Sequence, residues 1–254
     1  MSQSFRLVRM AISGWDINIM HRKNPWMTMW WSAALPGLGH LCQGVFLKGL
    51  LLMGWEILVN IKAGINLAIL YTFNGEFEQA SKVLDSEWAL FYGVILFFSM
   101  YDSYRISTET NLLVRLEMVQ PEKYFTTMKL TTGGLQFLGR SNPWAAVAWS
   151  ALLTGFGHLY NGRGFKSLIL LGWAVTIIWM ARINDSIIHT FMGEFERVGE
   201  SVKYEWLLFF PSIYIFAIWD SYSDAVEMNK LFADAQKNHF RKIYGWMDGE
   251  AVEE

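Results

Sequence analysis

Two histidines hold equivalent positions in two similar stretches of the chain, each directly after a glycine-rich break. They are His40 in PGLGHLCQG and His158 in TGFGHLYNG. A neutral imidazole can line a polar path or bind a metal ion. Structural zinc takes four ligands, and the one cysteine, Cys42, has no counterpart beside His158. The sequence therefore predicts no metal site. Two roles stay open for the histidines: lining a polar path, or donating to a carbonyl freed by the helix break.

Ionisable side chains also occur inside two long apolar stretches: Glu56, Lys62, Arg182, Asp185 and His189. Burying a charge in lipid costs several kcal/mol, so these groups are expected to face protein or water. Asp185 has the spacing of a same-face helical neighbour from both Arg182 and His189. Because the charged positions differ between the two stretches, structural pairing is favoured over a symmetric ion site. Asn66 and Asn184 do match and can bridge helices.

Two acidic residues, Asp102 and Asp220, end the last helix expected in each stretch, both within Asp-Ser-Tyr. The C-terminus of a helix disfavours an acid, so each is expected to have a basic partner. Arg22 and Arg140 are the candidates.

Enzyme motifs fail in this chain. The spacing of Gly39 and Gly44 is that of a phosphate loop, but Val45 and Phe46 follow where Lys and Ser/Thr are required. The sequence also has no nucleophile elbow, no zinc-protease motif and no paired-cysteine zinc signature. We therefore expect a protein that is not an enzyme and needs no cofactor.

The chain contains one unit written twice. Residues 22–111 align with residues 140–229 at a constant offset of 118, and 39 of the 90 pairs are identical. Such internal symmetry is common in membrane proteins. Three helical pieces are expected in each unit. The first opens at Asn-Pro, with Asn as N-cap, and the later two cover 48–73 and 88–104, or 166–191 and 206–222. Acidic connectors join the second piece to the third.

The first piece of each unit is broken, at positions that also allow close packing: Pro36, Gly37, Gly39, Gly155 and Gly157. It either crosses the membrane or enters and returns as a re-entrant segment. Leaving out Lys62 and Arg182, the re-entrant arrangement puts 16 lysines and arginines on one side and 3 on the other, whereas six crossings give 11 and 8. Cytoplasmic loops are rich in these residues, so charge favours the re-entrant arrangement. Hydropathy favours six crossings, because this piece is the longest uncharged run in each unit.

Composition indicates an integral membrane protein. The chain is 53% hydrophobic and only 17% charged, whereas soluble domains carry roughly 25% charged residues. Residues 24–47 and 141–162 are uncharged, and each run exceeds the roughly 18 residues of a candidate membrane segment. A net charge of −2 without a basic run argues against nucleic acid as a partner. We therefore predict an all-α, polytopic protein in a lipid bilayer.

The flanking segments are expected to be amphipathic. Residues 1–21 fit a helix that lies in the headgroup layer or packs on the end of the protein itself. Residues 112–139 are expected to be a linker between the units. Residues 230–254 are expected to form an amphipathic tail, helical to about residue 244, with an acidic, frayed end.

The string SALLTGFGHLYNGRGFKSLILL resembles the transmembrane hairpin family built around a Gly-x-Gly-x-x-Tyr-x-Gly turn. Each unit also resembles the helical extension that precedes the core of some bacterial carbohydrate ABC permeases. The likeness is carried by Ser150, Ala151, Leu152, Gly155, Gly157, Tyr160, Asn161, Gly162, Lys166 and Asp220-Ser221-Tyr222. The permease core is absent, and Cys42 and Gln43 depart from the pattern. The resemblance implies a bacterial membrane module linked to transport or assembly, and it transfers no catalytic residue.

Together these observations predict a non-enzymatic multi-pass membrane protein, an accessory, scaffold or assembly partner. Its own partner is expected to be another membrane protein or a second copy of the chain. The alternative is a small channel or carrier with a midplane polar path lined by His40, His158, Asn66 and Asn184. The expected location is the bacterial cytoplasmic membrane, with both termini in the cytoplasm.

Overall fold

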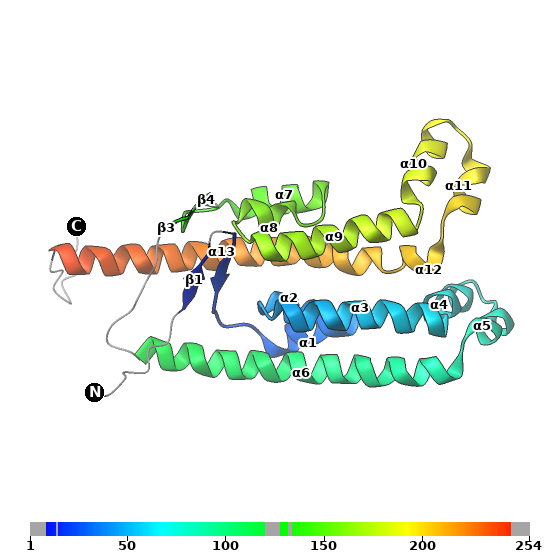
Figure 1. Ribbon diagram of the computed structural model, residues 1–254, viewed down its shortest axis with the longest axis horizontal. Coiled ribbons are helices and arrows are strands. Elements are labelled where there is room, and N and C mark those ends of the chain that lie inside the picture. Colours follow the sequence, from blue (N-terminus) through cyan, green and yellow to red (C-terminus); the bar gives the residue numbers. More distant parts are fainter. Residues whose placement is uncertain (1–8, 14, 120–127, 132–133, 245–254) are drawn as a thin grey trace, which may run out of the picture.

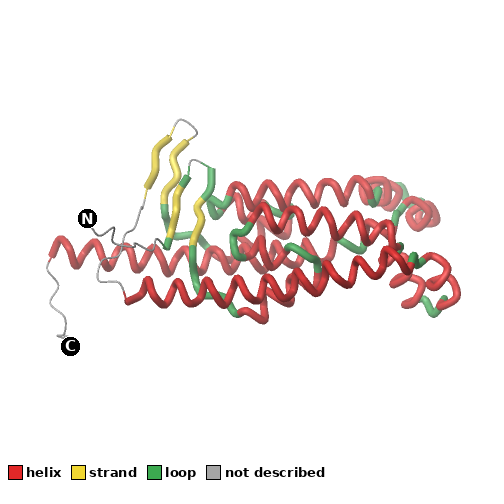
Figure 2. The backbone as a smooth tube through the Cα atoms, turned by 60° about the horizontal axis from the view of Figure 1, so that its bottom comes forward, coloured by secondary structure: helices red, strands yellow, loops and turns green. Residues whose placement is uncertain are grey.

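The computed structural model describes residues 9–13, 15–119, 128–131 and 134–244. Within them the chain is all-α, as predicted, apart from two short β-hairpins (Figures 1 and 2). The helices of the first half are α1 (Pro25–Ala34), α2 (Leu38–Cys42), α3 (Phe46–Ala63), α4 (Ile65–Phe73), α5 (Phe77–Val83) and α6 (Ser86–Val119). Those of the second half are α7 (Pro143–Leu152), α8 (Phe156–Tyr160), α9 (Gly164–Met180), α10 (Ile183–Phe191), α11 (Phe195–Ser201), α12 (Tyr204–Leu207) and α13 (Phe210–Tyr244).

Equivalent elements recur along the chain. Helices α7 to α12 each begin 118 residues after α1 to α6. The hairpins recur as well: β1 (Met10–Ile12) pairs with β2 (Ile17–Ile19), and β3 (Met128–Thr131) pairs with β4 (Gly134–Phe137), both antiparallel. In this structure the recurrence therefore begins at the first hairpin, ahead of the aligned residues 22–111.

The two halves lie the same way up. In Figure 1, α6 and α13 run in the same direction with α3 between them, and α3 and α9 both run the opposite way. The connectors α5 and α11 consequently lie at one end of the bundle, and the hairpins lie toward the other (Figures 1 and 2).

The opening segment of each unit begins as the sequence predicts. The Asn24 side chain caps α1 by accepting from the Trp26 amide at 3.0 Å, with Pro25 in the first turn, and Asn142 caps α7 in the same way. Helix α1 then ends at Ala34, and α2 starts after Gly37, whose φ is 103°. Such a left-handed conformation favours glycine.

After this break the segment turns back, so that its start and its end lie beside the same turn of α6. Thr28 in α1 donates to the Ser103 carbonyl at 3.3 Å, and the Gly37 amide donates to Ser99 Oγ at 3.1 Å. The Gln43 side chain, just after α2, donates again to the Ser103 carbonyl at 2.9 Å. From Ser103 to Ser99 is one turn of α6, so the segment dips by about 6 Å along that helix before it returns.

The second piece of each unit is bent, where the sequence suggested one continuous helix over 48–73 and over 166–191. Helices α3 and α4 meet at 61° across Gly64, and α9 and α10 meet at 61° near Arg182. Gly64 has a φ of 68° and Arg182 a φ of 58°. A left-handed residue ends a helix, and glycine adopts this conformation without the steric cost that arginine meets.

No helix among the described residues has, by itself, both the length and the apolarity of a membrane crossing. Three pairs of helices, each joined through a bend, meet both criteria when taken together. They are α3 with α4, α5 with α6, and α9 with α10, with bends of 61°, 86° and 61°.

The flanking segments differ from expectation. In place of a helix over 1–21, the described part forms the β1–β2 hairpin, closed where the Ser13 amide donates to the Asp16 carbonyl at 2.9 Å. Its isoleucines alternate with less buried residues, which suits a strand. The expected linker over 112–139 begins as the last turns of α6 and holds β3–β4. The tail is helical to Tyr244, and the acidic end expected beyond it lies outside the described residues, as do 1–8 and 120–127.

Two apolar clusters hold the bundle together. One lies between the halves: Trp31, Leu35, Leu41, Met53 and Ile57 of the first half pack with Leu170, Ile177, Phe209, Ile213 and Phe216 of the second. The other packs the β1–β2 hairpin against α13, through Met228, Leu231 and Ala235. Arg9 ties this hairpin to both long helices, since its guanidinium pairs with Glu117 of α6 at 3.4 Å and Asp234 of α13 at 3.1 Å.

Candidate functional site

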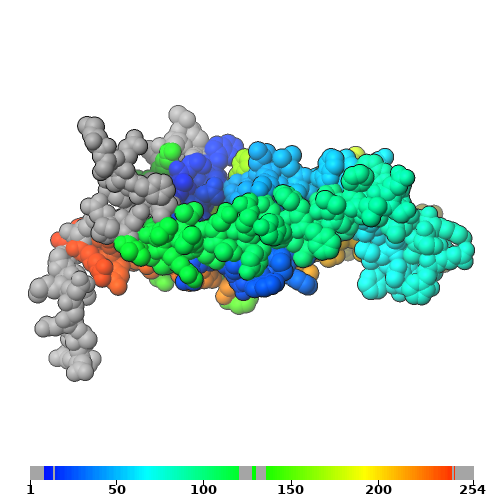
Figure 3. Space-filling view, turned by 90° about the horizontal axis from the view of Figure 1, so that it is seen from below, coloured from blue at the N-terminus to red at the C-terminus, as the bar shows by residue number. Residues whose placement is uncertain are grey.

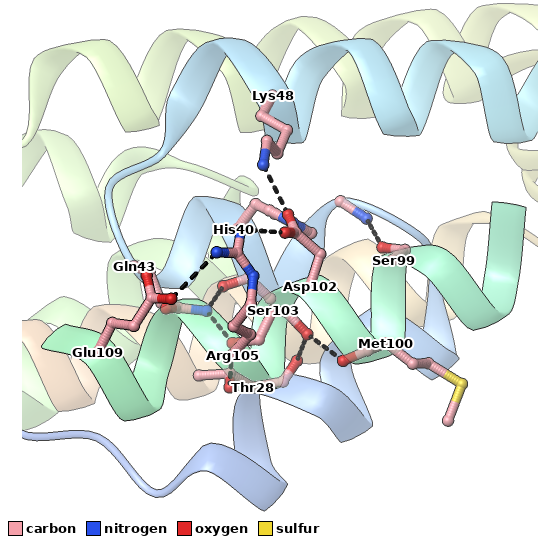
Figure 4. Close-up of polar contacts among 12 residues, drawn as sticks. Thr28, His40, Gln43, Lys48, Ser99, Met100, Asp102, Ser103, Arg105 and Glu109 are labelled. Atoms are coloured by element: carbon pink, nitrogen blue, oxygen red, sulfur yellow. Dashed lines mark hydrogen bonds and ion pairs between the residues drawn. The ribbon is translucent and has the colours of Figure 1, made fainter. Parts of the chain in front are cut away.

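Each half carries a buried polar cluster where its opening segment meets its long helix. In the first half, His40 Nε2 donates to Asp102 Oδ2 at 3.0 Å, because a carboxylate can only accept. Lys48 Nζ contacts the same oxygen at 2.7 Å, and Arg105 Nη2 contacts Asp102 Oδ1 at 2.8 Å. Figure 4 shows the three side chains converging on this carboxylate from α2, α3 and α6. We call these four residues the first cluster.

The second cluster repeats this geometry and extends it. His158 Nε2 donates to Asp220 Oδ2 at 3.0 Å, and Lys166 Nζ contacts the same oxygen. Lys166 also reaches Asp224 Oδ2 at 2.8 Å, and Arg163 Nη1 pairs with Asp224 Oδ1 at 3.2 Å. These five residues contain two carboxylates and two cations outside the histidine, so their formal charges balance.

The two clusters differ in what surrounds the shared His, Lys and Asp. Arg163 and Asp224 stand where the first half has Val45 and Ile106, and Ser223 stands where it has Arg105. The Lys48 side chain is 40% exposed, whereas that of Lys166 is fully buried. The second cluster is therefore sealed inside the protein, and the first is open to its surroundings on the lysine side.

Close backbone approach puts the histidines in place. A Cβ on Gly39 would collide with the Thr28 carbonyl oxygen, and one on Gly157 would collide with that of Ala146. The short helices α2 and α8 can therefore lie directly against α1 and α7, and they carry the imidazoles to α6 and α13. Pro36 lies at the break between α1 and α2. Gly155, with a φ of 99°, lies at the break between α7 and α8.

The chemistry open to these clusters is limited by burial. An aspartate that orients a histidine is part of many general-base sites, but both imidazoles are fully buried. The Nδ1 atoms of His40 and His158 have no hydrogen-bond partner among the described residues. We infer that the clusters fix the opening segments to the long helices.

Three side chains of the second cluster have the layout of a metal site. His158, Asp220 and Asp224 offer ligand atoms that lie within 4.8 Å of one another. The Lys166 ammonium, however, contacts both carboxylates, so it already supplies the positive charge that a cation would bring. The geometry fits an internal ion-pair network better than a metal centre.

The first hairpin closes the second cluster from outside. Asp16 Oδ1 accepts from the Phe165 amide at 3.3 Å, at the start of α9, and Arg163 Nη2 reaches Asn18 at 3.5 Å. Burial raises the pKa of Asp16, against the lowering effect of Arg163. Burial also lowers the pKa of the nearby His21, with Lys23 adding to that effect. The β1–β2 hairpin thus covers the second cluster on the side of Arg163.

The residues of the predicted polar path have separate partners or surroundings. His40 and His158 are each held by an aspartate. Asn66 is buried and donates to the Glu205 carbonyl in α12 at 2.7 Å, so it does bridge helices of the two halves. Its counterpart Asn184 is exposed at the surface.

The predicted ionisable residues fall into separate places. Arg182 pairs with Asp185 at 3.0 Å, as its spacing suggested, and this pair is exposed. His189 contacts Glu194 at 2.9 Å, where Asp185 was expected. Glu56 is buried and accepts from Asn60 one turn along α3 at 3.4 Å, while Lys62 is exposed.

Sequence reasoning missed the partners of the aspartates. Arg22 and Arg140 were expected beside Asp102 and Asp220, but Lys48 and Lys166 take that place. One pattern could have shown it. Within the apolar stretches, His, Lys and Asp are the ionisable residues that are identical between the halves at the offset of 118.

Comparison of the chain with protein-family models, with curated proteins and with solved structures gave no match.

Proposed function

We propose that this chain is a non-enzymatic scaffold protein of the bacterial cytoplasmic membrane, with both halves the same way up in the bilayer. The observation that carries the proposal is the apolar outer surface of the bundle between the polar clusters and the acidic connectors. Large apolar side chains are exposed along it on all four long helices, among them Leu51, Trp55, Leu90, Val94, Phe97, Val175, Trp179 and Ile215. Exposed apolar area of this extent is typical of a lipid or protein contact.

The dimensions fit a bilayer. From Ser86 to Asp102, α6 advances by roughly 25 Å, close to the hydrocarbon thickness of about 30 Å. In this arrangement α3, α6, α9 and α13 cross the membrane as a packed bundle, since none of them has by itself both the length and the apolarity of a crossing, and α1–α2 and α7–α8 enter from the cytoplasmic side and return. The connectors then face outward, and the hairpins lie in the cytoplasm with most of the Lys and Arg, as the positive-inside rule requires.

A scaffold is favoured over a channel or carrier because the polar groups are paired with one another. Both histidines are held by ion-pair networks, and Asn66 is engaged by the Glu205 carbonyl. The connectors α5 and α11 both carry exposed Glu side chains, α5 also carries Lys82 and α11 carries Arg197, and both helices have little buried surface. They are the surfaces we assign to a partner protein outside the membrane.

Liposomes that contain the purified protein and a trapped pH-sensitive dye test this assignment. After a pH step, and in parallel sucrose-shrinkage measurements, we expect protons and sucrose to leak no faster than from protein-free liposomes. The matched variant is His40→Ala/His158→Ala. If the wild-type protein lets protons or sucrose through and this variant does not, the protein is a channel or carrier and the scaffold proposal is wrong.

A further inference from the structure

The two halves contribute non-equivalent residues to the contact between them. On the first half it uses Trp31, Leu35, Leu41, Met53 and Ile57, which we call the donor face. On the second half it uses Ile169, Trp173, Phe209, Ile213, Phe216 and Trp219, which we call the acceptor face. Trp31 is central: its ring lies 5.2 Å from those of both Phe216 and Trp219.

Among the residues that the structure describes, the equivalent contact with the roles of the two halves exchanged is not made. The second half has its own donor face, formed by the residues 118 positions further on: Trp149, Leu153, Leu159, Leu171 and Val175. The first half likewise has an acceptor face: Leu51, Trp55, Phe91, Phe98 and Tyr101, which are exposed, and Ile95, which is buried. Trp31 is 7% exposed but Trp149 is 46% exposed, and Phe216 is fully buried but Phe98 is 51% exposed. Both open faces keep the apolar character of their buried counterparts.

Polar contacts between the halves are likewise made by residues of the first half and not by their equivalents in the second. Asn66 of the first half donates to the Glu205 carbonyl of the second, while the matching amide of Asn184 is left exposed. The β1–β2 hairpin is buried against the turn before α9, where the Ile17 amide donates to the Gly162 carbonyl at 3.1 Å. In the β3–β4 hairpin, Met128 and Phe137 are exposed. The donor face, the Asn66 amide and the β1–β2 hairpin of the first half thus contact the second half, whereas the equivalent features of the second half are exposed.

A one-way contact belongs to the heterologous class, which leaves one unused face at each end. A two-fold contact would have engaged both pairs of faces. Figure 1 places α7 and α6, which carry much of the open donor and acceptor faces, on opposite edges of the bundle, so one molecule cannot join them to each other. Figure 3 shows α6 along the surface of the molecule, uncovered on that side.

We propose that a second copy of this chain covers these faces, with the donor face of one molecule against the acceptor face of the next, in the geometry of the internal contact. The inference rests on the proposed membrane location. Because the halves lie the same way up, the operation that relates them in a bilayer is a rotation about the membrane normal. Repeating it traces a circle of units in the membrane plane.

A cysteine pair copied from the internal contact tests this. Inside the chain, Ser212 Oγ donates to the Ala34 carbonyl at 3.2 Å. Subtracting 118 from the first and adding it to the second gives Val94 and Leu152, which are 69% and 72% exposed. On a Cys42→Ser background, differently tagged chains with Val94→Cys and with Leu152→Cys are co-expressed, and their membranes are treated with a short bis-maleimide.

We expect a cross-linked species of twice the chain mass that carries both tags. The homotypic pairs 94–94 and 152–152 should give none, because a head-to-tail contact keeps them apart. Ala34→Cys/Ser212→Cys in one chain is the positive control and should cross-link internally. If that control reacts and the mixed pair does not, or if only homotypic pairs react, the proposed head-to-tail association is wrong. Alkaline extraction of the same membranes tests the location separately, since an extractable protein would contradict the proposed function instead.

Discussion

Replacing Asp220 by asparagine is expected to lower the free energy of unfolding by about 3 kcal/mol, because the buried cations Lys166 and Arg163 are then left with one carboxylate between them, that of Asp224. The Lys166 side chain is fully buried, and Asp220 and Asp224 are the acids that it contacts. His158 would also lose the carboxylate to which it donates. Thermal unfolding in detergent measures the effect.

The first half supplies the matched control. Asp102→Asn removes the equivalent carboxylate, but Lys48 is 40% exposed and can turn to water or lipid headgroups. We expect a loss of about 1 kcal/mol or less, as for exposed ion pairs. Equal losses for the two variants would contradict the view that only the second cluster is sealed.

The two halves differ at two further positions, and this difference supplies a second comparison. The first half holds Val45 and Ile106 where the second holds Arg163 and Asp224. Because apolar pairs can replace buried ion pairs at little cost, Arg163→Val/Asp224→Ile is expected to unfold close to the wild-type temperature. Arg163→Val alone should be clearly less stable, since it leaves Asp224 with Lys166 only. A double variant that is less stable than Arg163→Val alone and than Asp224→Ile alone would rule out this interpretation.

The second large effect is expected from Gly157→Ala, with a loss of about 3 kcal/mol in the free energy of unfolding. The added Cβ would meet the Ala146 carbonyl oxygen and the Ser150 hydroxyl. Relieving that clash moves α8 away from α7 and takes His158 away from Asp220. Thermal unfolding in detergent again measures the loss.

Gly172→Ala, in α9, is the control for this substitution. A Cβ at Gly172 meets nothing within 4 Å, and alanine has the higher helix propensity. This variant should be as stable as the wild type or slightly more so. Should Gly157→Ala unfold at the same temperature as Gly172→Ala, close packing of α8 on α7 is not what places the histidine.

Local features of the fold were predictable from the sequence. Asn24-Pro25 defines a helix start by itself, because an N-cap and a first-turn proline act within three residues. The break at Gly37 follows equally from local conformation. The first hairpin was missed because its apolar residues also fit a helical period, and only the turn at Ser13 and Asp16 separates the two interpretations.

Long-range features were less accessible. His40 and Asp102 lie 62 residues apart, so a helical spacing rule cannot pair them. The direction of the contact between the halves was also hidden. Trp31 and Trp149 are the same residue in similar surroundings, and only the packed structure distinguishes the covered one from the open one.

The central claim is that both halves lie the same way up in a bilayer, with the acidic connectors outside. Single cysteines on a Cys42→Ser background test it directly, at Lys82 in the connector α5, at Lys203 just after the connector α11, and at Lys230 toward the other end of α13. A membrane-impermeant maleimide applied to intact cells should label 82 and 203, and should label 230 only after permeabilisation. Labelling of 82 and 203 from opposite sides, or of 230 from outside, would contradict the account.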